Sequence, residues 1–448
     1  MSRLRNAARG AFSSRFLRES STLQAASLAM AVSNVAGSVA LAHILGAREL
    51  SVYYLAISAY ALVWTFLNLG LGPVAAMRIA GSVRSGDTGQ LSASLGVFLR
   101  LALMLGLVSC GIGLLTHAFA PPWLAEKIFK VDGVRVVGYA AILAIGPLFE
   151  APRNICVSAL QGERRMLALS RVELGQELAR LGFVVMGALI TRDALGPTLG
   201  LLAGTLVGAL LAIDGYSRER REEGSILPPL LTALRAKGVG AGSAIKEGVK
   251  IGLVRNVHSL GVETIPSLLL GAFGNSVWVT YLRNAQRVGG MLRVLMLGIN
   301  RTALPVFSQL AHVKDVPGLR RSYWKVSALS GTATTIGLAV ALPLLPFAIR
   351  LLYPEDFWGP VYTLVLILSP GIAIASFSVA NDVFYLVTQQ MRVAVLISLG
   401  GLIVTTIVCA VCVHLMPEIG AAVGLSTACL WSLVHVAFAG RWLRKHGA

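Results

Sequence analysis

The segment VWVTYLRNAQRVGGMLRVLMLGINRTALPVF, residues 277–307, is apolar over most of its length and yet carries four arginines. An arginine at the centre of a membrane helix costs roughly 2.5–3.5 kcal/mol, so such residues face a wet cavity or a partner. On a helix, Arg283 and Arg301 share one face, Arg287 lies beside them and Arg293 lies on the flank of that face. The segment therefore predicts a membrane helix with a positive stripe, which is typical of a path for an anion.

The composition extends this prediction to the whole chain. Hydrophobic residues make up 55% of the 448 residues and charged residues only 13%, whereas an average soluble protein has about 25% charged residues. Apolar stretches long enough to cross a hydrocarbon core of ~30 Å recur along the sequence. We therefore predict an all-α polytopic membrane protein. The five cysteines lie in apolar runs and are expected to pack as small hydrophobes, so we expect no disulfide framework and no metal site.

The apolar runs predict about twelve transmembrane helices in two six-helix lobes. The expected helices are residues 21–45, 51–79, 91–119, 136–160, 166–190, 195–215, 248–271, 277–307, 326–352, 361–388, 392–415 and 419–440. We expect a basic N-terminal segment at 1–20, an N-lobe at 21–215, a cytoplasmic linker at 216–247, a C-lobe at 248–440 and a cytoplasmic tail at 441–448.

The two halves also resemble one another. ILGARELSVYY at 44–54 aligns without gaps with LLGAFGNSVWV at 269–279, and each stretch ends the first helix of its half and opens the second. An even number of helices in each half makes the two repeats parallel, related by an axis along the membrane normal.

The net charge of +18 predicts orientation rather than nucleic-acid binding, because the sequence has no basic globular domain. Most of the 39 lysines and arginines fall in the N-terminus, in alternate loops and in the C-terminus. The opposite loops hold only Arg48, Lys127, Lys130, Arg135, Arg192 and Arg350. Since basic loops stay in the cytoplasm, we predict that both termini are cytoplasmic.

Eight polar residues are candidates for binding an anionic headgroup. They are Arg283, Asn284, Gln286, Arg287, Arg293 and Arg301 of the arginine segment, Arg255 of the preceding helix and Arg100 of the third helix. An arginine fork binds phosphate oxygens in a planar, bidentate way and is not neutralised by deprotonation. Arg287 and Arg293 lie nearest the middle of their helix and are the expected centre of the site.

Two acids deep in the second half, Glu263 and Asp382, are candidates for coupling transport to H⁺ or Na⁺. Glu263 has a purely structural alternative, which is an ion pair with Arg287 on the next helix. In the first half, Glu150 with Arg153 and Glu177 with Arg180 have the spacing of intrahelical pairs.

No catalytic arrangement is present in the sequence. It lacks the GxxxxGK[ST] loop that cradles nucleotide phosphates, and no Ser/His/Asp or metal-ligand constellation stands out. We therefore expect a protein that is not an enzyme and that holds no cofactor.

The stretch LAHILGARELSVYYLAISAYALVWTFLNLGLGPVAAMRIAG, residues 41–81, resembles the opening of the Wzx-type polysaccharide flippases of the MOP exporter superfamily. Its Leu45-Gly46, Tyr53-Tyr54 and Leu69-Gly70-Leu71-Gly72 match the family's pattern, followed by the basic Arg78. In the second half, Ala285, Gln286 and Arg287 match the family's A-Q-R stretch, and Pro305 falls where the family commonly has a proline.

This resemblance implies two lobes around a central cationic cavity that opens alternately to either side of a bacterial inner membrane. It implies a polyprenyl-pyrophosphate-linked oligosaccharide as substrate, moved to the outer leaflet for cell-surface polysaccharide biosynthesis, and polysaccharide polymerase or export proteins as partners.

Three alternatives stay open. A MATE-type multidrug or cation antiporter has similar lobes, but its cation-binding carboxylates have no counterpart in the first three helices here, where Asn34 is the deepest polar residue of the first helix. A peptidoglycan-precursor flippase usually has two more helices. Outside transport, the alternative is a scaffold in a polysaccharide-assembly complex.

Overall fold

The structure is a computed structural model, and it describes residues 17–68, 71–129, 132–163, 165–222, 225–236, 242, 246, 248–249, 252, 256–257, 259–313 and 315–446. Within these ranges, the side chains of residues 17–27, 73, 84, 292–305, 309 and 312 are not described.

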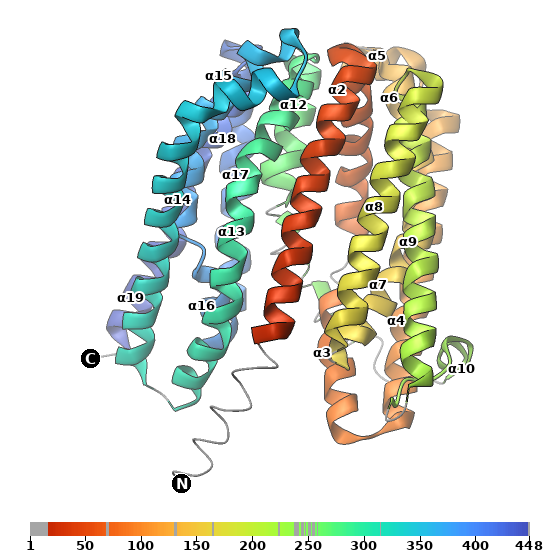
Figure 1. The fold of residues 1–448 in the computed structure, drawn as a ribbon, viewed down its shortest axis with the longest axis vertical. Coiled ribbons are helices and arrows are strands. Elements are labelled where there is room, and N and C mark those ends of the chain that lie inside the picture. Colours follow the sequence, from red (N-terminus) through yellow and green to blue (C-terminus); the bar gives the residue numbers. More distant parts are fainter. Residues whose placement is uncertain are drawn as a thin grey trace.

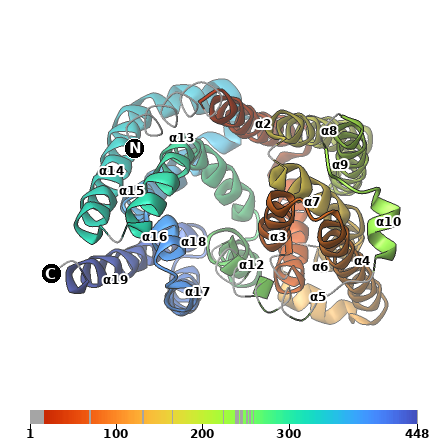
Figure 2. The same cartoon turned by 90° about the horizontal axis from the view of Figure 1, so that it is seen from below.

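Every regular element in the described part of the chain is a helix, and the helices form two lobes that stand side by side (Figures 1 and 2). The N-lobe contains α2 (Leu17–Leu67), α3 (Leu71–Ser85), α4 (Thr88–Phe119), α5 (Pro122–Ile128), α6 (Gly133–Leu143), α7 (Pro147–Gly162), α8 (Met166–Thr191) and α9 (Leu195–Arg221), and the short α10 (Leu230–Arg235) packs against it. The C-lobe contains the π-helix η2 (Leu260–Thr264), α12 (Ile265–Phe273), α13 (Trp278–His312), α14 (Val316–Leu352), α15 (Glu355–Ser376), α16 (Asn381–Val387), α17 (Met391–Leu415), α18 (Gly420–Ala428), the 3-10 helix η3 (Cys429–Trp431) and α19 (Ser432–Lys445).

The described helices confirm the predicted all-α membrane class, and they account for the predicted passes as follows, while the number twelve stays a prediction. Eight stretches are each long and apolar enough to cross a membrane, and α6 with α7, bent by 42°, forms a ninth. One of the eight, Leu28–Leu67, reverses direction at Gly46, so it belongs to two passes, of which α3 completes the second. The remaining passes are η2 with α12, and α13, whose arginines lower its hydropathy.

Several helix ends differ from the prediction, such as the start of the ninth helix, α14, which begins at Val316 rather than at residue 326. The second predicted helix, 51–79, is broken before Leu71, where α3 begins. The sixth runs on to Arg221 rather than ending at residue 215. Arginines at 218, 220 and 221 occupy the last turn of α9, and positive charge there interacts favourably with the negative end of the helix dipole.

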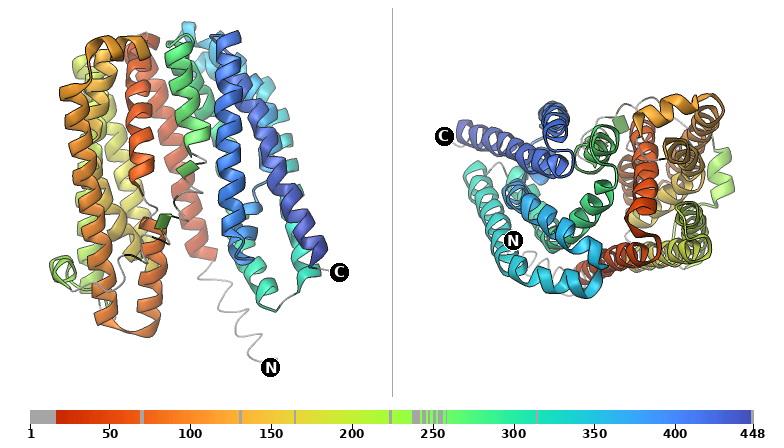
Figure 3. Two further views of the ribbon diagram at one scale, coloured as in Figure 1. Left: turned by 180° about the vertical axis from the view of Figure 1, so that it is seen from behind. Right: turned by 90° about the horizontal axis from the view of Figure 1, so that it is seen from above.

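The reversal inside α2 takes place at the upper end of the molecule as drawn in Figure 1. Gly46 has φ 68° and ψ 175°, a backbone region that essentially only glycine adopts freely. The chain therefore turns without a loop, and residues 17–45 and 47–67 form two helices that run side by side (Figures 1 and 3).

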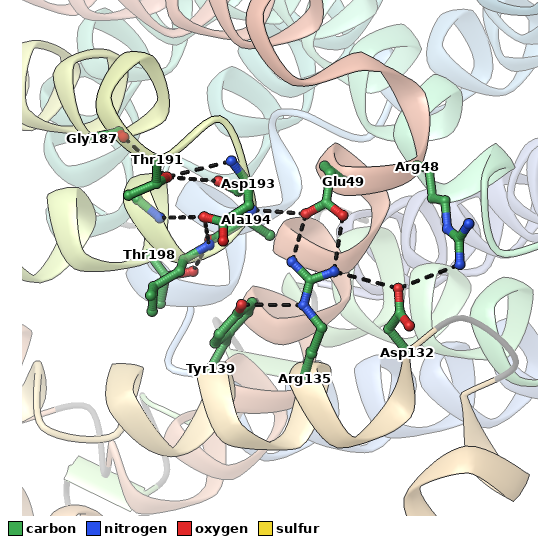
Figure 4. A network of polar contacts seen from close by, with 12 residues as sticks. Arg48, Glu49, Asp132, Arg135, Tyr139, Gly187, Thr191, Asp193, Ala194 and Thr198 are labelled. Carbon is green, nitrogen blue, oxygen red and sulfur yellow. Dashed lines mark hydrogen bonds and ion pairs between the residues drawn. The ribbon is translucent and has the colours of Figure 1, made fainter.

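An ion-pair network holds this turn to the rest of the N-lobe (Figure 4). The Arg135 guanidinium of α6 donates to both carboxylate oxygens of Glu49, at 2.9 and 2.7 Å, and also contacts Asp132 at 3.5 Å. The same Glu49 carboxylate accepts from the backbone N–H of Ala194 at 2.9 Å, directly before α9. One carboxylate thus joins α2, α6 and the α8–α9 turn.

Among the described residues, the apolar core that both lobes share lies at the upper end. The largest core there contains Tyr54 of α2, Leu282 of α13 and Phe357 of α15. The two cores at the lower end each belong to one lobe, with Leu91 in the N-lobe core and Phe307 in the C-lobe core. The lobes are therefore closed against one another at the upper end, and separating their lower ends would divide none of these cores.

Replacing Gly46 by alanine is expected to destabilise the fold by about 1–3 kcal/mol, because the backbone conformation is strained for any residue with a Cβ. A Cβ at this position would meet nothing within 4 Å, so the cost is confined to the backbone. Thermal unfolding in detergent, followed by tryptophan fluorescence, measures the effect. The control is Gly182→Ala in α8, where a Cβ also meets nothing within 4 Å and alanine is the better helix former. Equal melting temperatures for the two variants would contradict the assigned strain.

Glu49→Gln is expected to lower the free energy of unfolding by about 1–3 kcal/mol, since it removes the charge from hydrogen bonds that join three elements. The matched control is Asp214→Asn, which breaks an i,i+4 pair with Arg218 whose side chains are 52% and 77% exposed. Such an exposed pair contributes about 0.3–0.5 kcal/mol. The same melting experiment compares the two, and a Glu49→Gln protein as stable as Asp214→Asn would show that the network is not structural.

Candidate functional site

The first turns of α13 carry the arginine segment along the contact between the lobes. The helix begins at Trp278 near the upper end, and the Thr280 hydroxyl donates to the carbonyl oxygen of Ala47, at 2.8 Å, in the α2 turn. Leu282 and Ala285 of α13 are fully buried in the core that both lobes share. This packing places the next polar residues against α2 of the N-lobe.

Arg283 is held between the two lobes. Its Nη1 contacts the Glu263 carboxylate of the C-lobe at 3.2 Å, and its Nη2 donates to the Ser58 hydroxyl of α2 at 2.8 Å. The arginine side chain is 11% exposed and that of Glu263 60% exposed. The Nε atom is buried and has no acceptor among the described residues, so a buried donor stays available for a ligand.

Arg287 lies one turn below Arg283 and also points to the N-lobe. Its Nη1 donates to the Tyr54 hydroxyl at 2.9 Å, and its guanidinium carbon lies 5.0 Å from the centre of the Tyr54 ring. Both contacts are with a neutral group, through a hydrogen bond and a cation–π interaction. The predicted pairing of Glu263 with Arg287 is therefore wrong, because Glu263 pairs with Arg283, one helical turn nearer the upper end.

An irregular segment supplies the other side of the site. Residues Leu260–Thr264 form a π-helix, and α12 follows with Pro266 in its first turn. The Gln286 amide donates to the carbonyl oxygen of Val262 at 2.9 Å. A π-turn widens the helix by one residue and is frequent at functional sites, and here it carries the carboxylate of Glu263.

Asn284 extends the polar contacts toward the first helix of the N-lobe. Its side chain is fully buried, and its oxygen accepts from the Tyr353 hydroxyl at 3.3 Å. The Tyr353 hydroxyl in turn lies 3.2 Å from that of Ser38 in α2. This chain of neutral hydrogen bonds crosses between the lobes beside the arginine pair.

The contacts on α2 follow one face of its second helix. Ala47, Tyr54 and Ser58 bond to α13. About two and three turns beyond Ser58, the carbonyl oxygens of Thr65 and Asn68 accept from the Asn256 amide, at 3.0 and 2.6 Å. We call this set of contacts the lobe seam. It runs along most of the helix and is polar throughout.

Other predicted residues lie elsewhere. Arg100 donates to the carbonyl oxygens of Leu234 and Ala236, at 3.0 and 2.9 Å, and so fixes the end of α10 instead of joining the arginine pair. Asp382 lies on α16 between Ala380 and Val383 of the lower C-lobe core, which also contains Phe307. From Arg287 to Phe307 the helix rises about 30 Å at 1.5 Å per residue, so the structure does not bring Asp382 to the site.

Three further candidates are not described at the level of side chains. Arg255 lies outside the described residues. Arg293 and Arg301 belong to the described backbone of α13, but their side chains lie outside the described part. The site described here therefore consists of Arg283, Asn284, Gln286, Arg287 and Glu263, which is the upper part of the predicted stripe.

A second charged cluster lies inside the N-lobe. Arg180 of α8 contacts Glu177 at 2.6 Å, as the sequence predicted, and also donates to Asn34 of α2 at 3.1 Å. Arg153 of α7 donates to Asn154 at 2.8 Å. Tyr53 is within electrostatic range of both Arg180 and Arg287, so the cluster lies near the lobe seam.

Sequence reasoning missed Tyr54, Ser58 and Tyr353 as members of the site. Tyr54 and Ser58 lie within an apolar helix, and Tyr353 directly follows another. Tyr54 was noted only as an aromatic residue of the family resemblance. The one available signal is the spacing of Tyr54 and Ser58, which places two hydroxyls on one helix face. Which helix faces them is decided by tertiary packing.

Known proteins of this fold are transporters. No family model and no curated protein matches the sequence. Among solved structures, the chain is similar to a multidrug resistance MATE family transporter of the MOP superfamily. The outward-facing form of that transporter has a TM-score of 0.68 at 15% identity, covering 96% of this chain and 95% of the other. Its inward-facing form has a TM-score of 0.65 at 14% identity, covering 95% and 96%.

A third similar structure is a MOP superfamily transporter from Pyrococcus furiosus, with a TM-score of 0.63 at 13% identity and 96% coverage of both chains. Its description states that reverse polarity of the binding pocket suggests a different function. The three likenesses show that the protein has the fold of the MATE transporters, with two lobes of membrane helices.

Proposed function

We propose that this protein is a flippase that carries a polyprenyl-pyrophosphate-linked oligosaccharide from the cytoplasmic to the outer leaflet of a bacterial inner membrane. The observation that carries the proposal is the pair Arg283 and Arg287, whose guanidinium groups both bond to α2 in the lobe seam, with Glu263 as the carboxylate bonded to Arg283. The lower end in Figure 1 is then the cytoplasmic end. Polysaccharide polymerase or export proteins would receive the product.

The chemistry of the pair suits a diphosphate. Two arginines on successive turns offer several N–H donors toward one region, and Arg283 keeps a buried Nε donor without an acceptor among the described residues. Diphosphate oxygens are stronger acceptors for guanidinium than the neutral hydroxyls of Tyr54 and Ser58. Moving a diphosphate through lipid without such partners would leave polar groups unpaired, at several kcal/mol each.

The fold supplies the movement that flipping needs. The similar MATE transporter is known in both an inward-facing and an outward-facing conformation, so this architecture exposes one central region to either side in turn. In the present chain the shared core closes the upper end, while the lower ends have separate cores. A headgroup would then enter from the lower end while its lipid tail stays in the bilayer.

A cation antiporter is the second candidate, and the N-lobe cluster favours it. Glu177 with Arg180 lies against Asn34 of the first helix, which places a carboxylate beside residues 21–45, a stretch with no Asp or Glu. The similar structures also include multidrug transporters. The polarity of the lobe seam favours the flippase, since its two arginines outnumber the single carboxylate bonded to them.

Arg287→Gln is expected to slow flipping at least tenfold, because a hydrogen bond from a charged donor contributes about 1.5–3 kcal/mol. The assay uses purified protein in liposomes with a labelled polyprenyl-pyrophosphate oligosaccharide. The control Arg218→Gln alters an exposed arginine near the lower end of α9 and should flip at the wild-type rate. Folded Arg287→Gln protein that flips normally would exclude the assigned site. If wild type moves no such lipid but exports a cationic dye, the antiporter is correct, and if it transports neither, the scaffold alternative is favoured.

Coupling to H⁺ or Na⁺ is assigned to Glu263, because it bonds to Arg283 of the proposed anion site, whereas Asp382 lies on α16 beside the lower C-lobe core. We expect wild-type flipping to accelerate under an imposed pH or Na⁺ gradient, and Glu263→Gln to flip at one rate with or without it. Asp382→Asn should keep the response. If Glu263→Gln instead keeps the response and Asp382→Asn loses it, the coupling site lies on α16.

A further inference from the structure

The two arginines of the site are also the strongest polar contacts between the lobes at this depth. Arg287 bonds to Tyr54, and Arg283 bonds to Ser58 one turn further along the same helix of the N-lobe. Tyr54 is 1% exposed and Ser58 0% exposed, and the Ser58 hydroxyl donates to the carbonyl oxygen of Tyr54 at 2.8 Å. The acceptors are therefore fixed by their own helix, and they fix the guanidinium groups in turn.

These contacts use the same N–H donors that an anion would require. In the closed seam, one Nη of each arginine is occupied by a neutral hydroxyl from the opposite lobe. A diphosphate that binds each arginine in a bidentate way through the Nη now bonded to a hydroxyl displaces Tyr54 and Ser58 as acceptors. The exchange is favourable, since a phosphate oxygen carries charge whereas the hydroxyl is neutral, and an arginine fork binds phosphate in a bidentate way.

We infer that Arg283 and Arg287 form an anion-released latch between the lobes, in which Tyr54 and Ser58 are positioning residues that hold the arginines until a diphosphate takes them. The inference deepens the proposed function and relies on it only for the identity of the anion. Because the anion binds better when the arginines are free of α2, it shifts the protein toward the unlatched state. Binding thereby drives the conformational change.

The direction of opening follows from the position of the latch. Arg283 lies five residues after the start of α13 at the upper end, or about 8 Å along the helix. Above it, the lobes are joined by the apolar core that they share and by hydrogen bonds between neutral groups, Thr280 with Ala47 and Tyr353 with Ser38. Releasing the two arginines therefore weakens the end that is closed in this structure.

The first test measures the affinity for inorganic pyrophosphate by calorimetry of the purified protein at fixed ionic strength. Tyr54→Phe keeps the ring beside Arg287 and removes only the competing hydroxyl, and Ser58→Ala removes the second. Each is expected to bind pyrophosphate at least threefold more tightly than wild type. The matched control is Tyr385→Phe, whose hydroxyl contacts His435 within the C-lobe, and it should bind as wild type does.

An unchanged affinity in both variants would overturn the latch. A weaker affinity in Tyr54→Phe would also overturn it, because the hydroxyl would then be a ligand of the anion rather than its competitor. Ser58→Ala is a small change in the same helix, and it keeps the inference testable if Tyr54→Phe does not fold.

The second test measures opening directly. One spin label replaces Glu126 within α5 of the N-lobe, and the other replaces Glu355 at the start of α15 in the C-lobe. Both positions are exposed. The labels are placed in a protein whose native cysteines have been replaced and that binds pyrophosphate as wild type does. Pyrophosphate should shift the distance distribution to longer values in wild type, and the Tyr54→Phe, Ser58→Ala double variant should show the longer distance without it. If pyrophosphate binds but the distance distribution between the labels does not change, the anion does not release the latch.

Two results separate this inference from the proposed function. If pyrophosphate opens the seam but no lipid-linked oligosaccharide is flipped, the latch stands and the lipid substrate is wrong. If flipping requires Arg287 but neither affinity nor distance responds to the variants, the substrate stands and the latch is wrong. Comparing farnesyl diphosphate with pyrophosphate shows whether the latch takes a lipid diphosphate or the free anion, and tighter binding of the lipid form supports a headgroup in the seam.

Discussion

The structure depends on how two arginine side chains are accommodated inside a membrane helix bundle. Arg283 and Arg287 cannot shed their charge, and leaving them in lipid would be costly. Their partners come from Ser58 and Tyr54 of the other lobe and from Glu263 of the adjoining π-helix. At Arg283 and Arg287 the two lobes therefore contact one another through polar rather than apolar groups.

This polar seam is embedded in a rigid upper end. The glycine turn at Gly46 lets two helices of α2 run side by side without a loop, and Glu49 fastens that turn to α6 and α9 through Arg135 and Ala194. The N-lobe thus presents Tyr54 and Ser58 from a fixed helix. In the proposed latch, an anion displaces the neutral hydroxyls of Tyr54 and Ser58 because it is the stronger acceptor. The same geometry would therefore serve both as a contact between the lobes and as a site for an anion.

The membrane helices could be predicted from the sequence because each must be about twenty apolar residues long to cross a bilayer. Charged residues were harder to assign, since a helical spacing specifies a face but not the neighbour of that face. Arg100 illustrates this: its position deep in the third predicted helix suggested the anion site, and packing brought it to the carbonyl ends of α10. The pairing of Glu263 with Arg283 instead of Arg287 has the same origin, because a shift of one turn decides which partner is reached.

The sequence by itself determined the all-helical membrane class and the helix face that carries Arg283 and Arg287, because hydropathy and the 3.6-residue period are local properties of the chain. Only the tertiary structure decided that this face meets Tyr54 and Ser58, that a π-turn supplies Glu263 and that Asp382 lies far below. These pairings join residues more than two hundred positions apart in the case of Arg287 and Tyr54, and they result from how the two lobes pack together, which local periodicity does not encode.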